Sequence, residues 1–354
     1  MSKRKVIYII QSLGTGGAEV ALLSALPALN ESFEFRLVCL KKHDSKFTEC
    51  LSENERKNIV TFDGLPFNYL YALCFILKFK PEILISSLWK GAVLGLMTKC
   101  LKPKVKYIEF IHSTIFFHFL DKLFTIWALK LSDVVFCDST SAKAFANEYA
   151  HTKPIRIISF LRFRSPEMFI PKSKIKLKGL FIGRFHEVKR IDRLVSLTKK
   201  LVESGLPFEL DLYGRDDGTM SVVKELIKEY NLENNMILKG EISSDKIKDL
   251  FPFYDFYFQT SAVEGMAMSV VEAMQHGLVC VVTNVGEINN YACNEENAVI
   301  ISEPFENNLE DAIKQIKRST IDLEFYNKLS ENAYLEFASI EQFCDSLVKE
   351  LSEI

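Results

Sequence analysis

The sequence lacks any apolar run of the roughly 18 residues that a membrane-spanning helix needs. Its 44 Lys and Arg are balanced by 46 Asp and Glu, so no excess of positive charge indicates a nucleic-acid partner. The eight cysteines include no C-x-x-C pair, and neither clustered His nor a D-x-D arrangement is present. This argues against a zinc site, a disulfide framework or another metal site. The N-terminal apolar run is short and alternates like a strand, so a cytoplasmic protein without a signal peptide or metal is predicted.

The remaining composition is that of a folded protein with two domains. Hydrophobic residues make up 48% and charged residues 25%, and 354 residues exceed what one core usually organises. Short β-branched runs alternate with helical patterns, except at residues 151–178, where prolines and positive charges accumulate. We therefore predict an α/β fold of two doubly wound Rossmann-like domains facing each other across a cleft. The first covers 1–165 and the second 175–335, and a helix at 336–354 is predicted to pack back on the first domain.

Two aromatic-rich segments, 67–79 and 115–131, are flanked by lysines, and basic clusters lie at 99–106 and 153–178. As buried core helices the two segments need no further explanation. As surface helices they would lie in a membrane interface beside the basic clusters. The sequence leaves both interpretations open.

Open parallel sheets bind ligands at the carboxyl ends of their strands, so residues that follow strands are the first candidates. After the first predicted strand comes GTGGAE, in which Gly16 and Gly17 open a helix and could bring backbone N–H groups to an anion or a sugar. A simple tight turn is the alternative. His112 also follows a strand, where a structural role is the alternative. His118 is predicted in the middle of an apolar helix, with a structural role.

Two cations stand out in the second half of the chain. Arg184 leaves a predicted strand end, and Lys189 is expected in the first turn of the next helix. A cation there opposes the helix dipole, but a bound diphosphate would explain both residues. The alternative is simple pairing with Glu187 or Asp192.

The segment SAVEGMAMSVVEAM, residues 261–274, places two carboxylates eight positions apart. Glu264 is predicted in a strand-to-helix loop and Glu272 in the first turn of the helix. The S-x-x-E spacing of Ser269 and Glu272 also predicts a capping box, which would leave Glu264 unexplained. Carboxylates accept hydrogen bonds from the hydroxyls of ribose and hexose, so a sugar-binding role is the second interpretation.

Six features of the sequence together resemble a known family. They are the GTGGAE loop, the strand-end His112, the GRF-x-x-x-K block, a Tyr-Gly turn, the E-x7-E motif and the following GLVCVVTNVGE. The family is the retaining GT4 family of GT-B glycosyltransferases, also called glycosyl transferases group 1, of the bacterial polysaccharide-biosynthesis type. The likeness covers nearly the whole chain and implies the GT-B fold. Many members have E-G-F-G-x-P, whereas this chain has Ala267 for the second Gly and Ser269 for Pro. Ser269 is still expected to start the helix.

The resemblance implies that Glu272 binds ribose hydroxyls and Glu264 the donor sugar, while two cations neutralise the diphosphate in place of a metal. His112 would contact the donor sugar near the reacting carbon. The implied catalytic residues are His112, Arg184, Lys189 and Glu264. The implied donor-binding residues are Gly16, Gly17, Arg184, Lys189, Gly214, Gly240, Gly265, Met266, Ala267 and Glu272.

The implied activity is retaining transfer of a hexose or N-acetylhexosamine from a nucleotide-diphosphate sugar, a UDP-sugar, to a glycan acceptor in surface polysaccharide biosynthesis. The expected partners are the nucleotide sugar, a polyprenyl-linked glycan and an anionic membrane at the inner face of the plasma membrane. No cofactor is expected, because the nucleotide sugar is a substrate. A sugar-nucleotide 2-epimerase of the same fold and a non-catalytic nucleotide-sugar binding protein are the alternatives.

Overall fold

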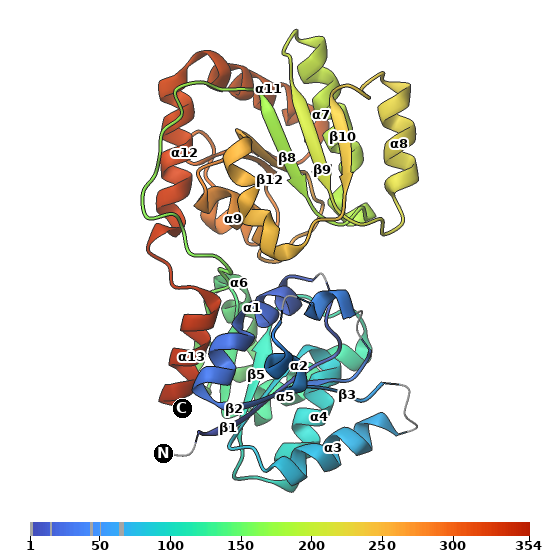
Figure 1. Ribbon diagram of the computed structural model, residues 1–354, viewed down its shortest axis with the longest axis vertical. Coiled ribbons are helices and arrows are strands. Elements are labelled where there is room, and N and C mark those ends of the chain that lie inside the picture. Colours follow the sequence, from blue (N-terminus) through green and yellow to red (C-terminus); the bar gives the residue numbers. More distant parts are fainter. Residues whose placement is uncertain (1–2, 15, 43–44, 50, 64–66) are drawn as a thin grey trace. The chain divides into compact units, whose positions relative to one another are not determined.

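The computed structural model describes residues 3–14, 16–42, 45–49, 51–63 and 67–354, and these form two compact units (Figure 1). The first unit holds the described residues up to Arg162 together with Glu341–Ile354, and the second holds Phe163–Ile340. Each unit is built around one parallel sheet with helices packed on it. The prediction of two doubly wound α/β domains is therefore confirmed.

The described part of the first unit contains a seven-stranded sheet. Its order is β3 (Ile59–Thr61), β2 (Glu34–Cys39), β1 (Lys5–Ile10), β4 (Ile83–Ser87), β5 (Lys106–Ile111), β6 (Val134–Cys137) and β7 (Ile155–Ile157). All neighbouring strands run parallel. The chain builds outward from β1 in one direction and then returns to add β4 on the other side. The boundary between β1 and β4 is thus a topological switch point, where such sheets bind ligands.

The helices of the first unit complete its layers. They are α1 (Gly17–Ser32), α2 (Glu53–Lys57), α3 (Asn68–Phe79), α4 (Leu88–Leu101), α5 (Phe119–Leu131), α6 (Thr140–Ala150) and α13 (Phe343–Glu353), with a 3₁₀ turn at Ser45–Thr48. The last helix lies against α1 (Figure 1). His118 does not lie in mid-helix as predicted: it caps the start of α5, where its Nδ1 accepts a hydrogen bond from the Asp121 N–H at 3.1 Å.

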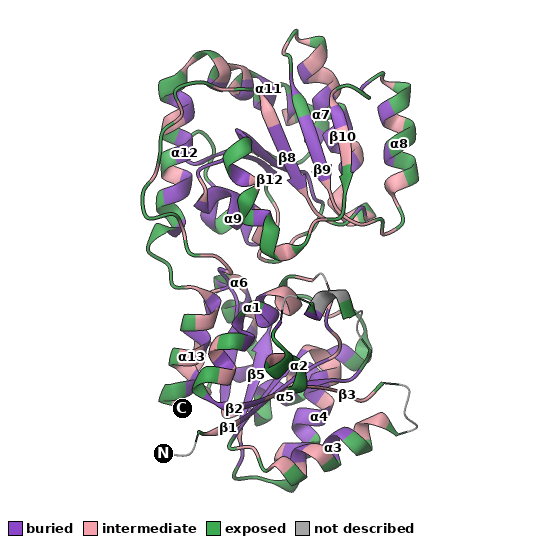
Figure 2. Cartoon of the chain, viewed as in Figure 1, coloured by how far each residue is buried: buried purple, intermediate pink, exposed green. Residues whose placement is uncertain are grey.

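The described residues of the second unit form a six-stranded parallel sheet. Its order is β10 (Met236–Gly240), β9 (Glu209–Tyr213), β8 (Lys178–Ile182), β11 (Phe256–Gln259), β12 (Val279–Thr283) and β13 (Ala298–Ile301). The order again reverses, here between β8 and β11, which places a second switch point at that boundary. In both units the central strands are buried, because helices cover both faces (Figure 2).

The remaining elements of the second unit connect these strands. The α-helices are α7 (Ile191–Glu203), α8 (Met220–Glu229), α9 (Met268–Gln275), α10 (Ile288–Tyr291), α11 (Phe305–Ile321) and α12 (Leu323–Ala338). The 3₁₀ turns are Glu187–Lys189, Ser244–Asp249 and Phe251–Phe253. The C-terminal part of the chain is therefore shared: α12 belongs to the second unit and α13 to the first.

A buried carboxylate binds the segment that precedes the first strand of the second unit. Asp255, just before β11, accepts hydrogen bonds from the Lys176 and Lys178 N–H groups at 2.8 and 3.3 Å. The ammonium of Lys172 lies 2.5 Å from its other oxygen. Charge and backbone donors thus fix the segment that leads into β8.

Replacing this carboxylate should destabilise the second unit. We expect Asp255→Ala to cost about 3 kcal/mol, because it leaves an ammonium and two N–H groups without their acceptor. Urea unfolding followed by circular dichroism measures the change. The unfolding transition followed by tryptophan fluorescence should keep its midpoint in urea. Trp89 and Trp127, the only tryptophans in the sequence, both lie in the first unit.

Asp311→Ala is the matched control. Its carboxylate pairs with Lys314 on the surface of α11, where both side chains are exposed, so its loss should cost less than about 0.5 kcal/mol. Equal effects of the two substitutions would contradict the anchoring role of Asp255.

Candidate functional site

The loops at the carboxyl edge of the second sheet are joined by their backbones. The Gly214 N–H, after β9, donates to the Gly240 carbonyl at the end of β10 (2.8 Å). The Phe185 N–H, after β8, donates to the Arg215 carbonyl (2.9 Å). A Cβ at Gly214 would lie 1.7 Å from the carbonyl oxygen of Gly183, so only glycine allows this approach. Gly214 and Gly240, both predicted site residues, thus hold neighbouring loops together.

The two loops that flank the switch point are joined as well. The Ala262 N–H, after β11, donates to the Val188 carbonyl, after β8, at 2.8 Å. The Thr260 hydroxyl donates to the Arg190 carbonyl at 3.0 Å. The loops after β8 and β11 therefore form one hydrogen-bonded surface.

An ion pair between Lys189 and Glu264 lies on this surface. The ammonium is 2.6 Å from Glu264 Oε1, and the side chains are only 19% and 8% exposed. The same oxygen accepts hydrogen bonds from the Ser261 hydroxyl at 2.5 Å and from the Gln259 amide. Two predicted site residues, 75 positions apart, thus meet at the switch point.

The position of Lys189 differs in detail from the prediction. It ends the 3₁₀ turn that begins at Glu187, and α7 starts only at Ile191, so Lys189 precedes the helix and does not lie in its first turn. Simple pairing with Glu187 or Asp192 is also not observed. Asp192 instead binds Arg190, and this contact lowers the pKa of the Asp192 carboxyl despite its partial burial.

Arg184 binds a different carboxylate at the same edge. Its Nη1 lies 2.5 Å from Asp217 Oδ2, in the loop after β9, and both side chains are partly exposed. The adjacent Asp216 accepts hydrogen bonds from the Met220 and Gly218 N–H groups, which lower the pKa of its carboxyl. The structure therefore places both predicted cations at the carboxyl edge, in separate ion pairs.

The predicted capping box is wrong. Helix α9 begins at Met268, and its N-cap is Ala267, which adopts a left-handed backbone (φ 52°) and has no side-chain capping bond. Ser269 lies inside the helix, and Glu272 lies in its second turn, not its first. Its side chain is buried, and its carbonyl accepts a hydrogen bond from His276 (2.8 Å).

Contacts from the segment after β12 explain why the loop before α9 has this shape. A Cβ at Gly286 would lie 2.1 Å from the Glu264 carbonyl oxygen. The Glu287 N–H donates to the Gly265 carbonyl at 3.1 Å, and the Tyr291 hydroxyl donates to the Met266 carbonyl at 3.2 Å. Tertiary contacts, not a capping side chain, therefore set the start of α9.

The remaining predicted site residues belong to the first unit. Gly16 is the N-cap of α1 and Gly17 its first residue, while Thr15 lies outside the described residues. The Glu19 carboxylate folds back so closely that a Cβ at Gly16 would lie 2.1 Å from it. His112 follows β5, where Asp138 is its partner at 3.2 Å.

A buried carboxyl group lies three residues before His112. Burial raises the pKa of Glu109, on β5, to about 8, although hydrogen bonds from Ser86 and Tyr107 oppose the rise. Glu109 therefore belongs to the interior of the sheet and not to its exposed edge.

Sequence reasoning missed the groups that bind the predicted site residues. Ser261 and Gln259 hold Glu264, and Asp217 holds Arg184. Ser87 and Asp138 contact His112. Each of these last two stands at the end of a strand, so the strand-end criterion that selected His112 could also have found them.

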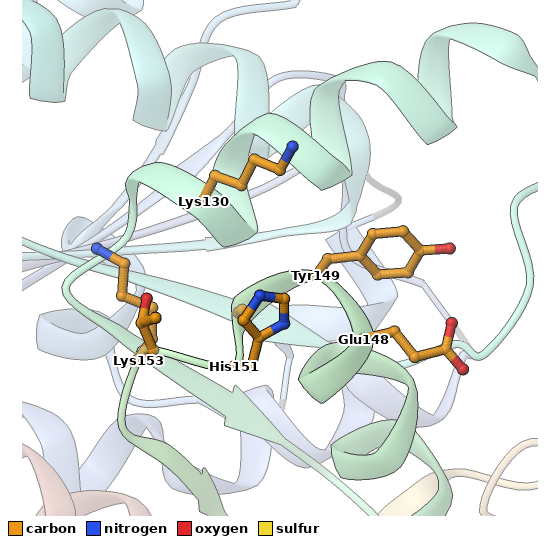
Figure 3. Close-up of a pocket in the computed structure, with 7 residues that line it drawn as sticks. Lys130, Glu148, Tyr149, His151 and Lys153 are labelled. Carbon is orange, nitrogen blue, oxygen red and sulfur yellow. The ribbon is translucent and has the colours of Figure 1, made fainter.

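One pocket lies away from these residues. It has a volume of about 360 Å³ and is lined by Lys130 and residues 148–153 (Figure 3). These residues end α5 and α6 and precede β7, so they lie at the amino edge of the first sheet, opposite His112. Among the residues that the structure describes, no group of three or more His, Cys, Asp or Glu side chains is arranged to hold a metal ion.

The second unit matches a protein family in sequence, and nearly the whole chain resembles solved structures in fold. Residues 168–336 match the family Glycosyl transferases group 1. Protein CapJ of Staphylococcus aureus is 34% identical over 125 residues, which are 35% of this chain and 31% of CapJ, so the match spans less than a third of that relative. An Escherichia coli enzyme, UDP-Gal:alpha-D-GlcNAc-diphosphoundecaprenol alpha-1,3-galactosyltransferase, is 24% identical across 94% of this chain and 91% of its own length.

The crystal structure of Anabaena HepE in complex with UDP and glucose aligns with 99% of this chain and 100% of its own. The TM-score is 0.78 at 18% identity, which shows a shared fold. The predicted GT-B fold is thereby confirmed. The family match at residues 168–336 covers nearly the whole second unit.

Proposed function

We propose that the protein is a metal-independent retaining glycosyltransferase. It moves a hexose or N-acetylhexosamine from a UDP-sugar to a lipid-linked glycan acceptor in surface polysaccharide biosynthesis. The observation that carries the proposal is the Lys189–Glu264 ion pair at the switch point of the second unit. The match of this unit to Glycosyl transferases group 1 supports the same reaction class.

The chemistry of a sugar diphosphate suits this ion pair. A mostly buried ion pair is costly to separate unless each charge gains a new partner. A diphosphate offers an anion to Lys189, and the neighbouring sugar offers hydroxyl donors to Glu264. Arg184, whose guanidinium fork suits phosphate oxygens, would exchange Asp217 for the same diphosphate. Both cations would then stabilise the charge that grows on the leaving nucleoside diphosphate.

The comparisons support a UDP-sugar as donor. The Anabaena neighbour is a complex with UDP and glucose, and the Escherichia coli relative is named for UDP-Gal. Glu272, buried on α9, is proposed to accept hydrogen bonds from the ribose hydroxyls. Retention of the anomeric configuration follows from the resemblance to GT4 enzymes.

A lipid-linked acceptor is supported by the surface of the first unit. Exposed aromatic and apolar side chains gather at the starts of α3 and α5, and we call them the aromatic rim: Phe67, Leu70, Tyr71, Ile115, Phe117, Phe119 and Leu120. Both helices pack beside α4 and start at the carboxyl edge of the sheet, where His112 lies. Among the described helices, none has the length and hydropathy to cross a bilayer. We propose that the aromatic rim, together with the exposed Lys122 on α5, binds an anionic membrane surface at the cytoplasmic face.

Product analysis tests the reaction. Incubation with labelled UDP-sugars and a polyprenyl-diphosphate glycan should yield an extended lipid, with the donor anomeric configuration kept in the NMR spectrum. Lys189→Gln should lower kcat by about 100-fold or more, because one fixed charge toward the leaving group is lost. An epimerised nucleotide would identify the 2-epimerase alternative, and unchanged ligand the binding-protein alternative.

The control for this substitution is Lys199→Gln. Lys199 lies on α7 in a weak surface pair with Glu203 at 3.9 Å, so its loss should leave kcat at the wild-type value. Wild-type turnover by Lys189→Gln would remove the catalytic role of the ion pair.

A thermal-shift panel tests donor binding. UDP should raise Tm, because a ligand that binds only the folded state stabilises it by about 2.7 kcal/mol at 100 times Kd. Arg184→Gln should reduce the shift with UDP but not the shift with uridine, which lacks the diphosphate. Equal losses with both ligands would place Arg184 away from the phosphates.

Vesicle flotation tests the membrane surface. Phe117→Ser with Phe119→Ser should weaken binding to anionic phospholipid vesicles by about tenfold or more, since two exposed phenyl groups no longer enter the interface. Ile321→Ser is the control, because Ile321 is 87% exposed but lies on the second unit. Flotation that is unchanged by the double substitution would remove the rim from the proposal.

A further inference from the structure

Four side chains of the first unit form one hydrogen-bonded chain along the carboxyl side of its sheet: Tyr8, Ser87, His112 and Asp138. They come from four neighbouring strands, in the order β1, β4, β5 and β6. This hydrogen-bonded chain therefore begins at the switch point and crosses the neighbouring strands of the sheet. The sequence-based candidates include only His112.

The geometry fixes the direction of each bond around the imidazole. His112 Nδ1 lies 3.2 Å from Asp138 Oδ2, and a carboxylate only accepts, so Nδ1 carries the proton. His112 Nε2 lies 3.0 Å from Ser87 Oγ, and in the neutral ring with that tautomer Nε2 is the acceptor, to which the hydroxyl donates.

The hydrogen bond at the Tyr8 end of this hydrogen-bonded chain also donates toward His112. The Tyr8 and Ser87 hydroxyls are 2.5 Å apart and both side chains are buried. Burial raises the pKa of Tyr8, so its phenol keeps its proton and donates to Ser87. Every donor in the chain thus has an acceptor, which strengthens the bonds along it.

Aromatic rings hold the imidazole in place from the sides. The ring centroid of His112 lies 4.3 Å from that of Phe110 and 5.6 Å from that of Phe160. Both the plane of the imidazole and its tautomer are therefore determined by groups of the protein.

We propose that Asp138 and Ser87 are positioning residues for His112, which hold its ring with Nδ1 toward the carboxylate and Nε2 toward the Ser87 hydroxyl. This inference rests on the proposed function, in which His112 contacts a sugar. The Ser87 hydroxyl occupies the lone pair of Nε2, so a sugar hydroxyl that donates to Nε2 would take the place of Ser87. Ser87 contacts Nε2 directly, so we assign it a role that acts through His112.

The tautomer can be measured without turnover. The full-length protein, labelled with ¹⁵N in its imidazoles, should give an Nδ1-protonated signal that disappears in His112→Gln. In Asp138→Leu the proton should move to Nε2, because the carboxylate acceptor is gone and the Ser87 oxygen can accept. A wild-type His112 protonated at Nε2 would overturn the inference.

Kinetics provide the second readout. Asp138→Leu should lower kcat about 10- to 100-fold, the rate equivalent of one hydrogen bond to a charged group, with little change in the KM of the UDP-sugar. Ser87→Ala should act in the same direction. Wild-type kcat in both variants would overturn the positioning role.

Asp133→Leu is the matched control. Its carboxylate binds Lys99 and the Tyr107 N–H, each at 2.8 Å, at the amino edge of the same sheet. It should lower Tm without changing the His112 signal or kcat. A protein with the Nδ1-protonated tautomer that transfers no sugar would contradict the proposed function and not the tautomer assignment.

Discussion

The reversal of strand order is the constraint on which both candidate ligand-binding edges depend. In the second unit it brings the loops after β8 and β11 side by side, although they are separated by some 75 residues in the sequence. Lys189 and Glu264 can meet at 2.6 Å only because of that topology. The hydrogen bond from the Ala262 N–H to the Val188 carbonyl joins these two loops, and Gly214 lets the loop after β9 approach the loop after β8.

The same topology produces a different chemistry in the first unit. There the switch point lies between β1 and β4, and it brings together the hydroxyls of Tyr8 and Ser87. One edge thus presents paired charges, and the other presents a chain of hydrogen bonds around a single imidazole. Charges suit phosphate oxygens, and a chain of hydroxyl and imidazole groups suits uncharged hydrogen-bonding groups.

The sequence predicts strand ends well and side-chain partners poorly, for a physical reason. Alternating strand and helix patterns are local, so they correctly placed His112, Arg184 and Glu264 at or after strand ends. The partner of Arg184 is Asp217, on the loop after a different strand, and no local pattern encodes that contact. The capping box failed similarly, because contacts from the segment after β12 set where α9 begins.

The start of α9 also bears on the departure from the GT4 pattern. Ala267 takes the place where many members of that family have glycine, and it adopts φ 52°, a backbone that costs an L-residue about 1 kcal/mol. Ala267 is buried, so the surrounding contacts impose this backbone instead of relaxing it. Ala267 lies between Glu264 and Glu272 in the sequence, the two acids with proposed roles toward the sugar and the ribose. The hydrogen bonds that Glu287 and Tyr291 donate to the carbonyls of Gly265 and Met266 hold the loop in this shape. The segment after β12 therefore offsets the strain and fixes where the two acids stand relative to each other.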